Sequence, residues 1–224
     1  MKQSFFYRAL LFELGLGMIA LLIATGFRIF LWNDIDLSPR SFGLAVIVTL
    51  PLLLGYFIVK AIPLRSVRRV QDIVEDIYRQ YLSDLSIFQL AVLSLAAGLG
   101  EELLFRGLLQ KGFAAFVGYC STVPLPETCF TDFRVWCVIL FVSLLFGMGH
   151  AITKTYFALS FLVSIYFCII FQATDNLLLP IFAHAFYDFF VFLVLYRTCR
   201  NDPAQSHDCG SVNFTIVVPL TALR

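Results

Sequence analysis

Three short segments of this chain place ionisable side chains inside otherwise apolar sequence. Such residues are costly in an apolar environment and are therefore candidates for function. A glutamate beside a histidine can activate a water molecule as a general base, and a second imidazole can donate a hydrogen bond to a developing oxyanion. These residue types fit hydrolysis of an amide without a protein nucleophile. The segments are GEELLFRG at 100–107, FGMGH at 146–150 and PIFAHAFYD at 180–188.

The spacing within each segment predicts which side chains share a helix face. Glu102 and Arg106 are four residues apart, so they can form an ion pair within one helix. Glu101 is rotated by about 100° from Glu102 and points elsewhere. We therefore expect three helices, each with one polar face, that converge inside a helical bundle. The other two segments repeat the four-residue spacing, in Phe146–His150 and His184–Asp188.

Other chemistries remain as alternatives for the same residues. Glu, His, His and Asp could bind a catalytic zinc ion, which keeps three protein ligands and an open position, although the sequence has no HExxH. A serine nucleophile has no support near either histidine, and Cys137 and Cys168 have no histidine at helical spacing. The polar residues could also serve only to hold helices together. We expect no cofactor, with zinc as the alternative.

The composition indicates what kind of elements must position these residues. Of the 224 residues, 60% are hydrophobic and 14% are charged, against about 45–50% and 25% in soluble domains. The chain is therefore predicted to be an integral membrane protein in contact with the lipid bilayer. A net charge of +1 gives no basic face for nucleic acid.

About six stretches are long and apolar enough to cross a bilayer as helices. None of them alternates apolar and polar residues as a barrel strand would. The sequence predicts an all-α polytopic transmembrane bundle that forms a single membrane domain over residues 1–224. The predicted spans are 9–31, 42–62, 86–108, 134–152, 155–174 and 177–197.

The connection at 65–85 predicts an additional helix with one apolar stripe and one charged face. Such a helix lies along the membrane surface or docks on the bundle; a substrate-steering or gating element is the alternative. Lysine and arginine are unevenly distributed, with eleven on the side of both termini and four on the other. The positive-inside rule then predicts that both termini are cytoplasmic.

Two cysteine pairs have spacings that leave their redox state open. Cys120 and Cys129 lie in the loop 118–133, which the predicted topology places outside, where a disulfide is stable. Cys199 and Cys209 have similar spacing, but the same topology places them in the cytoplasm.

The three segments resemble the motifs of a known family of intramembrane proteases. This family includes type II CAAX prenyl endopeptidases and bacteriocin-processing or self-immunity proteins, and its motifs are EExxxR, FxxxH and HxxxN or HxxxD. The resemblance covers about residues 95–192 and implies a peptidase with Glu101 as general base and His150 helping to activate water. It also implies an oxyanion hole formed by His184 with Asp188. Glu102 and Arg106 would support the site, and Phe146 would pack against it.

One residue departs from the prenyl-protein-processing branch, which has asparagine where this chain has Asp188. An ionised carboxylate repels an oxyanion, so Asp188 must be protonated or must orient His184. This favours the bacterial-type branch, an inner-membrane location, and a peptide or membrane-protein substrate, prenylated or not. A non-catalytic immunity or regulatory protein that binds a partner, a zinc-dependent protease and a proton or ion transporter are the alternatives. The oligomeric state is left open.

Overall fold

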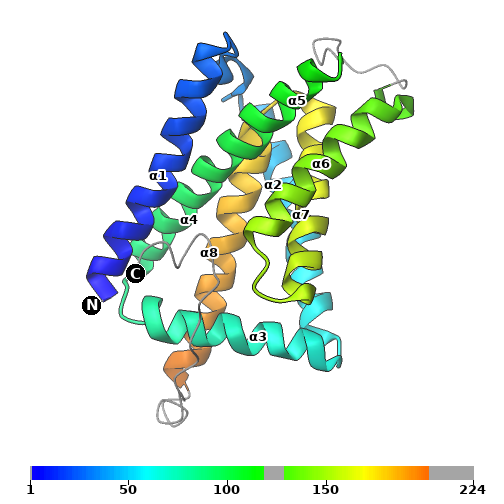
Figure 1. Ribbon diagram of the computed structural model, residues 1–224. Coiled ribbons are helices and arrows are strands. Elements are labelled where there is room, and N and C mark those ends of the chain that lie inside the picture. The colour runs from blue at the N-terminus through cyan, green and yellow to red at the C-terminus, as the bar shows by residue number, and fades with distance from the viewer. Residues whose placement is uncertain (1, 119–128, 202–224) are drawn as a thin grey trace.

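The computed structural model describes residues 2–118 and 129–201, and within these ranges the chain is helical without strands (Figure 1). The long helices are α1 (Lys2–Gly26), α2 (Pro39–Ala61), α3 (Arg65–Ile77), α4 (Ile87–Glu102), α6 (Phe133–Gly149), α7 (Lys154–Thr174) and α8 (Leu178–Asn201). The shorter elements are η1 (Leu31–Asp34), η2 (Tyr78–Leu82), η3 (Leu103–Gln110), α5 (Lys111–Phe116) and η4 (Cys129–Thr131).

In the described part of the chain, five helices are long and apolar enough to cross a membrane. They are α1, α2, α7, α8 and the continuous helix Ile87–Phe116, which comprises α4, η3 and α5. The remaining predicted span, 134–152, forms α6, which has 17 residues. Its length of about 26 Å is less than the ~30 Å of a bilayer core. The all-helical membrane architecture is confirmed, and the sixth expected span is the short one.

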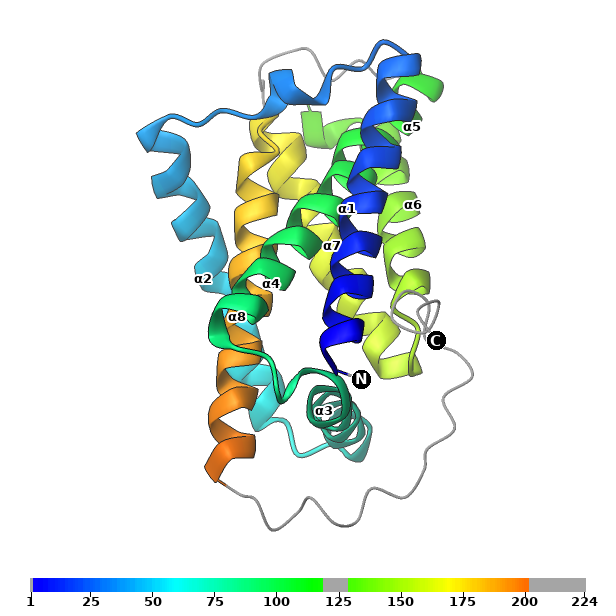
Figure 2. The same cartoon turned by 90° about the vertical axis from the view of Figure 1, so that its left-hand side faces the viewer.

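The long central helix that begins with α4 lies between α1 and α8 (Figures 1 and 2). Helix α8 also contacts α2, and α6 pairs with α7. Helix α4 begins at Ser86 because Ser86 and Gln89 form a reciprocal capping box. The first and third catalytic-type motifs therefore lie on directly packed helices, α4 and α8.

Two glycines of α4 allow its backbone to approach both neighbours closely, as small residues do between membrane helices. A Cβ atom at Gly98 would lie 2.8 Å from the backbone oxygen of Ile181 on α8. A Cβ atom at Gly100 would collide with the backbone carbonyl of Glu13 on α1. Helices α1 and α8 are thus held against α4 directly beside Glu101.

The predicted amphipathic helix is present as α3, which continues into η2. It runs across one end of the bundle, transverse to the long helices (Figure 1). Its apolar side is buried at Val67, Val70 and Tyr78, whereas Arg68 and Arg69 are exposed. The helix is therefore docked on the bundle, which was one of the arrangements expected from the sequence.

Candidate active site

The first motif lies where α4 passes into η3. Glu102 and Arg106 are completely buried, and Arg106 Nη1 donates to Glu102 Oε1 over 2.9 Å. Arg106 Nη2 donates to the backbone oxygen and the hydroxyl of Ser164 on α7, over 3.2 and 2.8 Å. The ion pair expected from the four-residue spacing is present, and its arginine also joins η3 to α7.

Aromatic rings surround the buried guanidinium of Arg106. Its carbon lies 4.9 Å from the ring centroid of Phe146 on α6 and 5.1 Å from that of Phe167 on α7. Cation–π contacts of this kind strengthen when they are desolvated. Phe146 therefore packs against the site through Arg106, which connects three helices of the bundle.

Arg106→Ala is expected to lower the free energy of unfolding by about 3–5 kcal/mol, because it leaves Glu102 as an uncompensated buried charge. Thermal denaturation of the purified protein in detergent measures the effect. Arg79→Ala is the matched control, since Arg79 and Glu75 form an ion pair at the same spacing, 2.6 Å apart, on the partly exposed α3–η2 segment. That change should cost about 0–1 kcal/mol. Equal losses in the two variants would contradict a structural role of the buried pair.

His184, on α8, lies between two carboxylates. Its Nδ1 is 2.8 Å from Glu102 Oε1, and its Nε2 is 3.5 Å from Asp188 Oδ2. Because Glu102 Oε1 also accepts from Arg106 Nη1 and a carboxylate oxygen only accepts, Nδ1 carries the proton of this hydrogen bond. The ring of Phe167 stacks on the imidazole with centroids 5.4 Å apart. Contacts at both edges and at one face of the imidazole ring therefore fix the orientation of His184.

His150 ends α6 and faces Glu101. Its Nε2 lies 3.8 Å from Glu101 Oε2, and its Nδ1 lies 2.9 Å from the backbone oxygen of Phe146. A carbonyl oxygen only accepts, so Nδ1 is the donor and Nε2 of the neutral ring is an acceptor. The ring also stacks on Phe146 with centroids 4.4 Å apart. The separation of Nε2 and Oε2 is too long for a direct hydrogen bond.

The residues of the site differ in exposure. The side chain of Glu101 is 7% exposed, whereas those of His150 and Asp188 are 18% and 29% exposed. His150 and Asp188 therefore form the more accessible side of the cluster. The structure thus brings together all seven residues that the sequence singled out: Glu101, Glu102, Arg106, Phe146, His150, His184 and Asp188.

Two residues at the site were not predicted from the sequence. Ser164 binds Arg106, and nothing in a serine within an apolar helix marks that role. Glu13 on α1 is 92% buried and interacts electrostatically with Glu101, His184 and Asp188. The signal for Glu13 was available, because a glutamate in the middle of an apolar span is a candidate by the same rule as the others.

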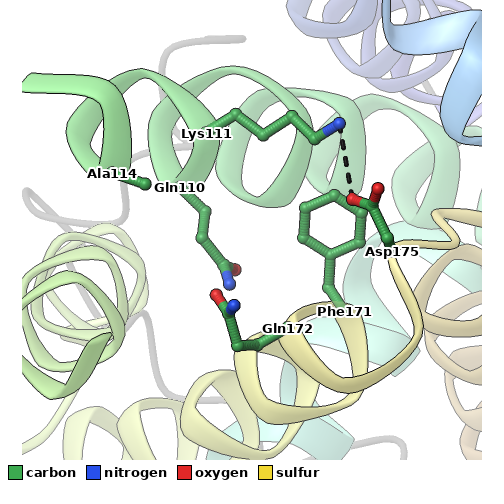
Figure 3. Close-up of a pocket in the computed structure, with 6 residues that line it drawn as sticks. All are labelled: Gln110, Lys111, Ala114, Phe171, Gln172 and Asp175. Atoms are coloured by element: carbon green, nitrogen blue, oxygen red, sulfur yellow. Dashed lines mark ion pairs between the residues drawn. The ribbon is translucent and has the colours of Figure 1, made fainter. Parts of the chain in front are cut away.

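A second polar cluster joins two connections at the other end of η3 (Figure 3). Lys111 Nζ lies 2.6 Å from Asp34 Oδ1 and 3.5 Å from Asp175 Oδ1, beside a small pocket that Gln110 and Gln172 also line. Burial raises the pKa of Asp34, and Lys111 opposes that rise. The cluster connects the α1–α2 and α7–α8 links to the central helix.

The structure bears on the zinc alternative and on the two cysteine pairs. Within residues 2–118 and 129–201, no three His, Cys, Asp or Glu side chains are grouped so that they could hold a metal ion. Cys120 and Cys209 lie outside the described residues, so neither predicted disulfide pair is described. Cys199 is a partly buried free thiol.

Comparison with known proteins identifies the family. Residues 83–190 match the family model described as type II CAAX prenyl endopeptidase Rce1-like. This segment contains all seven candidate site residues, and it is similar to the Rce1-like family of proteases. Neither the comparison with curated proteins nor that with solved structures gave a match.

Proposed function

We propose that this protein is an intramembrane endopeptidase in which Glu101 and His150 together activate a water molecule. The arrangement of these two side chains carries the proposal: two hydrogen-bond acceptors, Glu101 Oε2 and His150 Nε2, face each other over 3.8 Å. A water molecule has two protons to donate, so it fits between two acceptors that cannot bind each other directly. The family match over residues 83–190 supports a protease in general.

In this mechanism Glu101 takes a proton from the water as its oxygen attacks the carbonyl carbon of the substrate. His150 orients the water through the second hydrogen bond, because its Nδ1–H is fixed on the Phe146 carbonyl. The proton held by Glu101 is then available to the leaving amine. Positioned general bases of this kind contribute about 10²–10⁴-fold to rate.

His184 supplies the hydrogen bond to the oxyanion. Its Nδ1–H is used by Glu102, so its Nε2 can donate only when the imidazole is doubly protonated. Glu102 and Asp188 flank the ring on both edges and stabilise that cationic form. Asp188 is therefore assigned to orient His184 and to balance the charge of its doubly protonated ring. This role is compatible with a carboxylate at the position where related proteases have asparagine.

The proposed substrate is a peptide or membrane protein cut in or near the bilayer, with the scissile bond presented past His150 and Asp188. The bacterial inner membrane as location and the cytoplasmic placement of both termini stay predictions, and the proposal covers prenylated and unprenylated substrates alike. The absence of a cofactor also stays a prediction.

The test is cleavage of a broad set of fluorogenic peptides, prenylated and unprenylated, by detergent-purified protein with and without a chelator. We expect cleavage that survives chelation and is lost in Glu101→Gln. Activity that chelation removes and zinc restores would replace this mechanism with the zinc-dependent alternative. Cleavage of no peptide would favour a non-catalytic protein that binds a partner.

A further inference from the structure

Glu13 is the buried acidic side chain that the proposed mechanism does not use. It lies on α1, at the point where the α1 backbone contacts Gly100, the residue directly before Glu101. Its side-chain atom Oε2 is buried without a hydrogen-bond partner, and so is Oε2 of Glu101. Two buried carboxyl groups are thus contributed by adjacent helices at this contact, each with one oxygen that lacks a hydrogen-bond partner.

Among the described residues, no lysine or arginine forms an ion pair with either carboxyl group. On α8, His184 directs its two nitrogens at Glu102 and Asp188, and Asp188 adds negative charge. On η3, Arg106 is bonded to Glu102 and Ser164. The other cations on elements packed against Glu13 are Arg8, which donates to the Ser4 carbonyl, and Arg79, which pairs with Glu75.

Two carboxylates side by side in an interior of low dielectric cannot both stay ionised. One must carry a proton, which can then donate a hydrogen bond to the other. Glu101 is the member that faces His150 and the accessible side of the site. Glu13 lies on α1, where its backbone carbonyl contacts Gly100.

We propose that Glu13 and Glu101 form a carboxyl pair that shares one proton, with Glu13 holding it while Glu101 is ionised. In catalysis, which rests on the proposed function, Glu13 is a positioning residue. It keeps Glu101 ionised and oriented, and it keeps a second negative charge away from the oxyanion that forms beside His184. The first span thereby contributes to a site whose three sequence motifs all lie on other helices.

Infrared spectroscopy of the full chain in lipid nanodiscs tests the pair without any substrate. We expect a protonated-carboxyl C=O band at pH 7 that shifts in D2O and is missing from Glu13→Gln. The band should persist in Glu75→Gln, the matched control, because Glu75 is ionised in its pair with Arg79. If Glu13→Gln leaves the wild-type band in place, the proposal is wrong.

A second variant separates a pair from a lone buried acid. Glu101→Gln replaces the acceptor of the shared proton by an amide, so the frequency of the Glu13 band should change. An unchanged frequency would mean that Glu13 does not contact Glu101, which overturns the pair. Circular dichroism of both variants confirms that the helices are retained.

The pH dependence of kcat/KM supplies the functional readout. In the wild type, loss of the shared proton should lower kcat/KM by about tenfold per pH unit on the alkaline side. Glutamine does not titrate, so this alkaline fall should be absent from Glu13→Gln. Profiles of the same shape would contradict the positioning role. If the chain cleaves no peptide, the proposed function fails, and the infrared result still decides the pair.

Discussion

Glu101→Gln is expected to lower kcat/KM for peptide cleavage by about 10²–10⁴-fold, the contribution of a positioned general base. The amide keeps the volume and one hydrogen-bonding oxygen of Glu101, but it cannot accept a proton from water. Because Glu101 reaches His150 over only 3.8 Å, a water bound between them would remain bound and would simply not be deprotonated. The loss should therefore appear in kcat, with KM nearly unchanged.

Two comparisons make the Glu101 result specific. Glu75→Gln, on the partly exposed pair with Arg79, should cleave at the wild-type rate. Thermal denaturation of Glu101→Gln should stay near that of the wild type, because glutamine keeps the volume of Glu101 and an oxygen that can still accept a hydrogen bond. A variant that folds and keeps more than about a tenth of the wild-type kcat/KM would exclude Glu101 as the general base.

His184→Ala has the second largest expected effect, a decrease in kcat of about 10²–10³-fold, which is the value of one oxyanion-hole donor. Removal of the imidazole also deprives Glu102 of its 2.8 Å hydrogen bond. Part of the Glu102 charge stays compensated by Arg106, so we expect the fold to persist with a lower melting temperature. Single-turnover cleavage at saturating peptide measures the chemical step directly.

Asp188→Asn distinguishes the role of Asp188 from that of His184. Asparagine keeps a carbonyl oxygen near Nε2, but it does not balance the charge of a doubly protonated ring. We therefore expect a kcat loss of about tenfold or less, clearly smaller than that of His184→Ala. Equal losses in the two variants would show that Asp188 takes part in the chemistry itself.

The location of the site residues inside helices was predictable from local sequence alone. Composition and run length predicted an all-helical membrane bundle because a polypeptide in lipid must satisfy its backbone hydrogen bonds within each segment. The four-residue spacing of Glu102 and Arg106 predicted their ion pair, since side chains four positions apart share a helix face. The apolar stripe beginning at Val67 likewise predicted the docked helix α3.

The meeting of the three motifs depends on contacts between segments distant in the chain. Glu102 bonds His184 across 82 positions, and Arg106 bonds Ser164 across 58. No local periodicity specifies such pairs. The helix of the predicted span 134–152 ends at Gly149, which leaves His150 turned toward Glu101 on another helix.

The sequence by itself determined which residues are chemically competent and which of them share a helix, because both depend on residue type and on the period of the helix. The tertiary structure alone decided that Glu13 joins them. The first span, α1, carries no family motif. Only the close approach of α1 to Gly100 brings Glu13 to Glu101. The approach is possible because position 100 lacks a side chain, so backbone packing between two helices places Glu13 beside Glu101.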